Sequence, residues 1–127
     1  MKKLLLFLLA PLLLLTGCSK TEPAFRRISM AEAEKMMNTP GVLLVDVRTW
    51  EEYTAGHIPG AICIPVESIS APPEELPDKA QTILIYCRSG RRSVQAAEKL
   101  AALGYTGIVE IGGIQSWNGP LNTGENP

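Results

Sequence analysis

The chain has 127 residues, a length that fits one domain of ordinary size. Its 12 basic and 13 acidic residues give a net charge of −1 at pH 7, so the overall charge gives no support for a nucleic-acid partner. The three cysteines contain no C-x-x-C pair, which argues against a thioredoxin-type dithiol cycle.

The N-terminus has the pattern of a targeting segment. Lys2 and Lys3 give it a positive start, and residues 4–15 are almost wholly apolar. This run is shorter than the roughly 20 residues that span a bilayer, but it suits the core of a signal peptide. Its removal would take away two lysines and no acidic residue, so the rest of the chain is more acidic than the whole.

The residues that follow, Leu15-Thr16-Gly17-Cys18, resemble the bacterial lipoprotein box, in which the peptide is cut before the cysteine and the cysteine is acylated. Plain secretion with cleavage near Gly17 is the alternative. Acyl chains such as palmitate on Cys18 would anchor the protein to a membrane without spanning it. The expected location is the cell envelope, on the periplasmic side of a bacterial membrane, and Ser19 is compatible with the outer membrane. The expected organisation is a signal peptide (1–17), lipidated Cys18 with a tether (18–24), a folded domain (25–120) and a short C-terminal tail (121–127).

Predicted helices and strands alternate along the domain. Two S/T-x-x-E patterns predict helix starts after Ser29 and Thr49, with ends near Met37 and Gly56. Apolar runs predict buried strands at 42–47, 61–65, 82–87 and 107–111. A third helix is predicted to begin near residue 92 and to stop at Gly104, with a buried face that comprises Val94, Ala97, Leu100 and Ala101.

This alternation predicts an α/β fold with a largely parallel sheet. Open sheets of this kind bind ligands at the C-terminal ends of their strands, where Asp46 and Cys87 are placed.

The segment YCRSGRRS, residues 86–93, joins a thiol to a predicted anion-binding loop. Gly90 permits a tight turn, and the helix that follows offers unpaired N–H groups and the positive end of its dipole. Such donors lower the pKa of a thiol. Cys87 is therefore the candidate nucleophile, and the candidate substrate-binding residues are Arg88, Ser89, Gly90, Arg91 and Arg92. The alternative is an inert buried cysteine beside a solvated basic patch.

The spacing of the loop bears on the anion it would hold. Four residues separate Cys87 from Arg92, whereas cysteine-dependent phosphatases place five residues before their arginine, a spacing at which this chain has Ser93. A shorter loop encloses a smaller cradle, which suits one added sulfur atom better than a tetrahedral phosphate. A phosphatase or an arsenate reductase remains the second hypothesis.

Three motifs in order, VDVRTWEEYTAGHIPGAICIP, YCRSGRRS and GGIQSW, resemble a single-domain rhodanese, a family of sulfurtransferases, over residues 25–118. The resemblance implies a three-layer α/β/α fold with a mostly parallel central sheet. It also implies that Cys87 takes sulfane sulfur from a donor such as thiosulfate as a persulfide and passes it to cyanide or a thiol. Arg92 matches the arginine that closes the family loop. No metal or organic cofactor is implied, and the expected state is a monomer. A non-catalytic rhodanese-like binding module is the third hypothesis.

Other chemically active side chains are expected to be structural. His57 lies in a GHIPGA turn, and Asp46 with Arg48 matches a family pair that orders loops near the strand ends. Trp50 and Trp117 are expected to be packing residues. Cys63 is expected to be a small buried hydrophobe, with a disulfide to Cys87 or an accessory redox role as alternatives.

Overall fold

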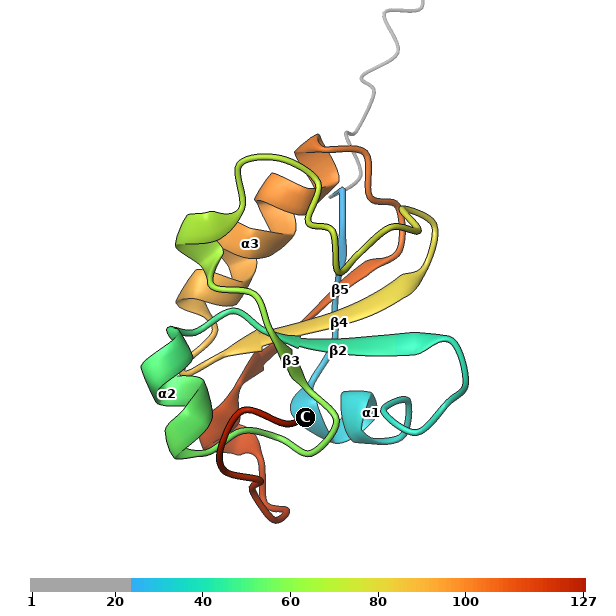
Figure 1. Ribbon diagram of the computed structural model, residues 1–127. Helices are drawn as coiled ribbons and strands as arrows, with labels where there is room; N and C mark the ends of the chain where they lie inside the picture. Colours follow the sequence, from blue (N-terminus) through green and yellow to red (C-terminus); the bar gives the residue numbers. More distant parts are fainter. Residues whose placement is uncertain (1–23) are drawn as a thin grey trace, which may run out of the picture.

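The computed structural model describes residues 24–127 (Figure 1). The predicted signal peptide and Cys18 lie outside the described residues. The elements in chain order are β1 (Arg26–Arg27), α1 (Met30–Glu34), β2 (Val42–Asp46), α2 (Trp50–Ala55), β3 (Ile62–Cys63), a short 3-10 turn η1 (Val66–Ser68), β4 (Thr82–Cys87), α3 (Arg91–Ala102), β5 (Ile108–Gly113) and a second 3-10 turn η2 (Ile114–Ser116).

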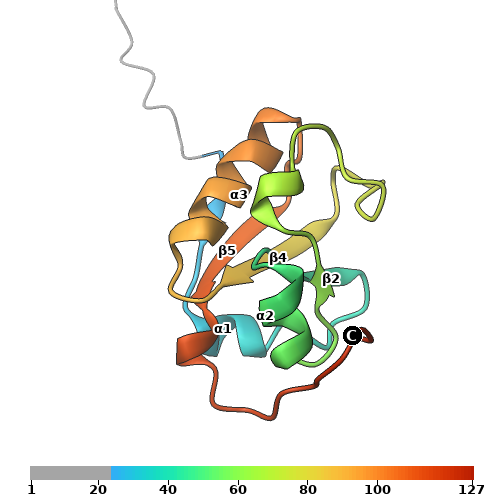
Figure 2. The same cartoon turned by 60° about the vertical axis from the view of Figure 1, so that its left-hand side comes forward.

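The strands form one five-stranded sheet in the order β1-β5-β4-β2-β3, and all four pairings within it are parallel. β4 therefore occupies the middle of the sheet, between β5 and β2. The polypeptide covers both faces of this sheet (Figures 1 and 2), and the predicted three-layer α/β/α class is confirmed. No helix within residues 24–127 is long and apolar enough to cross a membrane.

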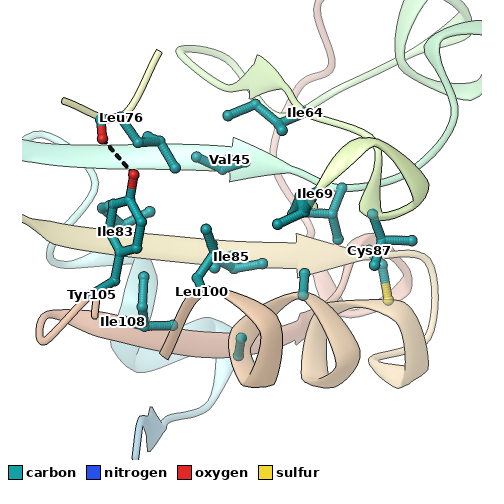
Figure 3. Packing of buried hydrophobic residues seen from close by; sticks show 14 residues of the cluster. Val45, Ile64, Ile69, Leu76, Ile83, Ile85, Cys87, Leu100, Tyr105 and Ile108 are labelled. Carbon is teal, nitrogen blue, oxygen red and sulfur yellow. Dashed lines mark hydrogen bonds between the residues drawn. The ribbon is translucent and has the colours of Figure 1, made fainter. Parts of the chain in front are cut away.

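Side chains that alternate along the strands divide the core into two clusters. On one face, Ile83, Ile85 and Cys87 of β4 pack with α3 and with the segment around η1. On the other face, Leu84 and Tyr86 pack with α1 and α2. Figure 3 shows Cys87 as the last member of its row, with its sulfur beside the first turn of α3. The pleat of β4 therefore places the thiol in the α3 layer.

Most predicted elements are present, with differences at their ends. Thr49 and Glu52 form the expected reciprocal capping box at the start of α2. α1 is shorter than predicted, because the chain leaves the helix after Glu34 for a series of turns that lead to β2. β1 is absent from the prediction, since a two-residue edge strand has no periodic pattern to recognise.

The buried face of α3 shares two of its four residues, Ala97 and Leu100, with the predicted face. Its buried positions are Ser93, Ala96, Ala97 and Leu100, whereas Val94 and Ala101 are only partly buried. The prediction was wrong because it chose the apolar Val94 over the polar Ser93 as the first inward position. The spacing of the observed set is that of one helix face, so Ser93 faces the sheet and the end of β4.

β5 contains an irregularity where it passes the end of β4. Ile85 pairs with Glu110, but Cys87 pairs with Gly113, so β5 uses one more residue than β4 over this interval. Gly112 takes up the extra length with a φ of +89°, a conformation that favours glycine. The bulge brings Gly113 against the backbone of Arg88, at the start of the Cys87 loop.

The C-terminal segment returns along α2 (Figures 1 and 2) and is held there by backbone hydrogen bonds. His57 and Asn122 bond to each other in both directions at 2.9 Å, and Gly124 N–H donates to Thr54 O. The fully buried imidazole of His57 stacks on Tyr53, with centroids 3.7 Å apart, and each of its nitrogens lies 2.8 Å from a backbone oxygen. His57 thus has a structural position in the turn between α2 and β3.

Gly113→Ala is expected to destabilise the protein by more than about 2 kcal/mol, because the added Cβ would collide with the Arg88 carbonyl and the Ser89 backbone. The φ of Gly113, −123°, suits any residue, so the cost would come from the collision alone. Urea unfolding of the full-length chain measures it. Gly124→Ala is the control, since its φ of +86° is strained but its Cβ would meet nothing within 4 Å. Equal losses for the two variants would contradict close packing at Gly113.

Candidate active site

Cys87 ends the central strand β4, and its side chain is buried, with 1% of its surface exposed. Gly90 adopts a left-handed conformation with a φ of +102° and serves as the N-cap of α3 without any side-chain cap. This turn directs the Gly90 N–H at the Cys87 sulfur, with N and Sγ 3.0 Å apart. The uncapped N-terminus of α3 thus acts on the thiol, as the sequence predicts.

Two opposing effects set the pKa of the Cys87 thiol. Burial is the larger single effect and raises the pKa, because it disfavours the charged form. Hydrogen bonds from the Ser93 side chain and from the N–H groups of Ser93, Gly90 and Ser89 together outweigh burial, and the net pKa is lowered. Cys87 is therefore a thiol whose surroundings favour the thiolate, the form that acts as a nucleophile.

The charged side chains of the loop point in different directions. Arg88 and Arg91 are exposed, as is Ser89. Arg92 turns towards α2 and binds Glu52 with both of its terminal nitrogens, at 2.7 and 3.1 Å. The Arg92 guanidinium lowers the pKa of the Glu52 carboxyl to about 2. Arg92 therefore joins the Cys87 loop to α2, and Arg88 and Arg91 are the loop arginines directed to solvent.

Three side chains of this site are absent from the sequence-based set. Ser93 lies with its hydroxyl oxygen 3.4 Å from the Cys87 sulfur. The Ser93 hydroxyl also lies 2.6 Å from Oε1 of Glu110, a buried carboxylate on β5. The third side chain is Glu52, which belongs to the site through its ion pair with Arg92. For Glu110 the sequence does contain a signal, because a charged residue inside the apolar run GIVEI is unexpected in a buried strand.

Cys63 and Cys87 lie on opposite sides of the sheet. Cys63 packs in the α1–α2 layer, whereas Cys87 packs in the α3 layer. Both cysteines are free, so the disulfide considered from the sequence is not formed. Burial is the main cause that raises the pKa of the half-buried Cys63 thiol, to about 11, with the Asp46 carboxylate as a second cause. Cys63 is thus poorly suited to nucleophilic chemistry.

Asp46 and Arg48 form the expected ion pair at the end of β2. The Arg48 guanidinium binds both Asp46 carboxylate oxygens, at 2.7 to 3.1 Å, and donates a further bond of 2.6 Å to the Gly56 carbonyl. The pair thus fixes the C-terminal end of α2 against the sheet. Within residues 24–127, no group of three or more His, Cys, Asp or Glu side chains is placed to hold a metal ion.

The structure is an α/β domain in which a thiol with a lowered pKa lies between the central strand of a parallel sheet and a helix N-terminus. The family model of the rhodanese-like domain matches residues 29–120, and the chain belongs to this family.

Two similar relatives are named as sulfurtransferases. A protein of Allochromatium vinosum named sulfurtransferase is 41% identical over 67% of this chain and 79% of its own length. The Escherichia coli thiosulfate sulfurtransferase PspE is 40% identical over 56% of this chain and 69% of its own length. A solved structure described as a rhodanese with anions from E. coli superposes with a TM-score of 0.60 at 37% identity, covering 65% of this chain and 99% of its own.

Glu52→Gln is expected to lower the free energy of unfolding by about 1 kcal/mol at neutral pH, a value reduced by the partial exposure of the ion pair. The folded-state pKa of Glu52 is depressed to about 2, so its contribution is present above the unfolded-state pKa and is lost as the pH falls towards 2. Urea unfolding of both proteins at several pH values measures the difference. The difference should shrink below about pH 4, and a pH-independent difference would count against the ion pair.

Proposed function

We propose that the protein is a thiosulfate sulfurtransferase that carries sulfane sulfur on Cys87 as a persulfide. The observation that supports this most directly is the buried Cys87 sulfur, which accepts a 3.0 Å hydrogen bond from Gly90 N–H and whose pKa is lowered. Membership of the rhodanese-like family and the names of two similar proteins agree with this chemistry.

The first half-reaction would be an attack by the Cys87 thiolate on the outer sulfur of thiosulfate. A bond forms between Sγ and that sulfur, and the sulfur–sulfur bond of thiosulfate breaks, with sulfite leaving as the bonding electron pair departs. The transferred sulfur carries the negative charge of the persulfide. The N–H groups at the start of α3 would stabilise that charge, as they stabilise the thiolate.

The second half-reaction would return the site to its starting state. A thiophilic acceptor, cyanide or a thiolate, attacks the outer sulfur of the persulfide and releases the Cys87 thiolate. Arg88 and Arg91 are exposed beside this loop and would attract an anionic donor. No metal or organic cofactor takes part in either step.

Reduced full-length protein mixed with thiosulfate is expected to gain the mass of one sulfur atom on Cys87, and cyanide should remove it with release of thiocyanate. The lowered pKa of Cys87 favours the thiolate that this reaction requires. Peptide mass spectrometry before and after cyanide measures the adduct and its site. Cys87→Ser is the matched control and should acquire no sulfur there.

The same experiment separates the alternatives. An unmodified Cys87 after thiosulfate, polysulfide and glutathione persulfide would overturn sulfur transfer and favour a non-catalytic binding module. Turnover of a phosphate ester or of arsenate that is abolished by Cys87→Ala would favour the phosphatase or arsenate reductase class instead.

We also propose that the protein is lipid-anchored in the bacterial cell envelope, on the periplasmic side. The support is the sequence alone: a basic start, an apolar run and the lipoprotein-box pattern that ends at Cys18. Several acyl chains on that cysteine would give a stable anchor, whereas one chain gives only marginal binding.

Cells that express the protein are expected to incorporate labelled palmitate into the wild type and not into Cys18→Ala, because only Cys18 stands in the lipoprotein box. Gel autoradiography of the immunoprecipitated protein measures the label. Cys63→Ala, which removes a cysteine outside the motif, is the control and should keep the label. Equal label in wild type and Cys18→Ala, or no label in either, would contradict the anchor.

A further inference from the structure

A continuous hydrogen-bonded row leads from the Cys87 sulfur to a buried carboxylate. The Cys87 thiol faces the Ser93 hydroxyl oxygen at 3.4 Å, and this oxygen lies 2.6 Å from Oε1 of Glu110. All three residues are at most 2% exposed. The row therefore joins two groups that can each lose a proton through one hydroxyl that can both donate and accept.

The Ser93 hydroxyl has one proton and more than one acceptor. Besides Glu110 and the Cys87 sulfur, it lies 3.0 Å from the Gly90 carbonyl and 3.4 Å from the Gly112 carbonyl. The contact with Glu110 is the shortest, and a hydroxyl bonded to a carboxylate is a strong charge-assisted pair. When Ser93 donates to Glu110, its lone pairs can accept the Cys87 thiol proton. When Cys87 is a thiolate, the sulfur and the carboxylate compete for the Ser93 proton.

The position of Glu110 is built into β5. Glu110 pairs with Ile85 of β4, two residues before Cys87, and shares the face of the sheet that α3 covers. The Gly112 bulge turns its own N–H onto Glu110 Oε1 at 2.8 Å, while Arg27 of β1 binds Oε2 at 3.2 Å. Glu110 thus has one oxygen held by Arg27 and the other directed at Ser93, which fixes the geometry of the row.

The far end of the row reaches a surface pocket. Glu110 lines a pocket of about 550 Å³ together with residues of β1, of the start of α1 and of the segment after β5, which include Arg27, Ser29, Glu32, Gly112 and Ser116. Cys87 does not line this pocket. Water in the pocket can therefore exchange protons with Glu110 from the side of the sheet edge at β1, separately from the loop that holds the thiol.

We propose that Ser93 and Glu110 form a proton relay for Cys87. In the forward direction the S–H bond of Cys87 breaks and its proton binds Ser93 Oγ, while the former Ser93 proton binds Glu110 Oε1. The products are a thiolate that accepts a hydrogen bond from Ser93 and a neutral Glu110 carboxylic acid. Glu110 then releases the proton to water in the pocket. No electron is transferred, and no co-reactant is needed.

The relay couples proton loss by Cys87 to proton gain by Glu110. The other charged groups around the row are Arg27 from β1 on Glu110, Arg92 from α3 near the Cys87 sulfur, and Glu32 from α1 at the pocket. In a state that holds one proton for the two acids, part of the population carries it on Glu110 with the sulfur charged. A constant fraction of thiolate then persists over a range of acidic pH.

The rate of Cys87 alkylation by iodoacetamide tests the relay in the full-length chain between about pH 4 and pH 9. Peptide mass spectrometry reports alkylation at Cys87 separately from Cys18 and Cys63. In the wild type the rate should level off in the acidic range. In Glu110→Gln, which keeps an acceptor oxygen for Ser93 and Gly112, the rate should fall roughly tenfold per pH unit without levelling. Ser93→Ala should behave like Glu110→Gln.

Glu32→Gln is the matched control, because it removes an exposed carboxylate from the same pocket without touching the row. It should keep the acidic levelling of the wild type. Levelling that persists in both Glu110→Gln and Ser93→Ala, or that is absent from the wild type, overturns the relay. The relay depends on the proposed function only in taking Cys87 as the reacting group. Alkylation needs no sulfur donor, so its outcome is independent of sulfur transfer.

Discussion

A negative charge on the Cys87 sulfur must be solvated almost entirely by the protein, because the side chain is 1% exposed. The donors available are the N–H groups where α3 begins and the Ser93 hydroxyl. They reach the sulfur only if β4 passes into α3 through a very short loop, which the left-handed Gly90 allows. The short loop also accounts for the bulge in β5. The loop backbone packs directly against Gly113, which is possible because Gly113 has no side chain.

A cradle made of backbone N–H groups recognises charge and size more than chemical identity. Arg92 adds little to this recognition, because its guanidinium is bound to the Glu52 carboxylate and its charge is largely compensated there. In the proposed reaction, the attraction of an anionic sulfur donor would depend on the α3 N-terminus and on Arg88 and Arg91 at the surface. The ion pair with Glu52 serves mainly to hold the loop against α2. For the proposed sulfur transfer, few side chains are therefore placed to select one sulfane donor over another.

The parts of the fold that are encoded locally could be predicted from the sequence. Apolar runs gave four of the strands, and the capping box at Thr49 placed α2 correctly, because these signals act over a few residues. The Cys87 loop was predictable for the same reason. The inward position of Ser93 was not predictable, since it depends on the rotation of α3 about its axis. An error of one residue in the position of the buried face was enough to place Ser93 outward. Glu110 needs the strand order and the Gly112 bulge to bring it to the loop.

A buried carboxylate two groups away from a nucleophilic thiol presents an electrostatic difficulty. A fixed negative charge on Glu110 would raise the pKa of Cys87 and oppose the N–H groups that lower it. Arg27 offsets the charge only from an exposed position on the outer edge, where solvent screens it. While the proton of the thiol stays on Glu110, before its release to water, the two negative charges do not coexist. A shared proton thus reconciles a buried acid with an activated cysteine, and it gives Ser93 a role that a simple packing residue at this position would not have.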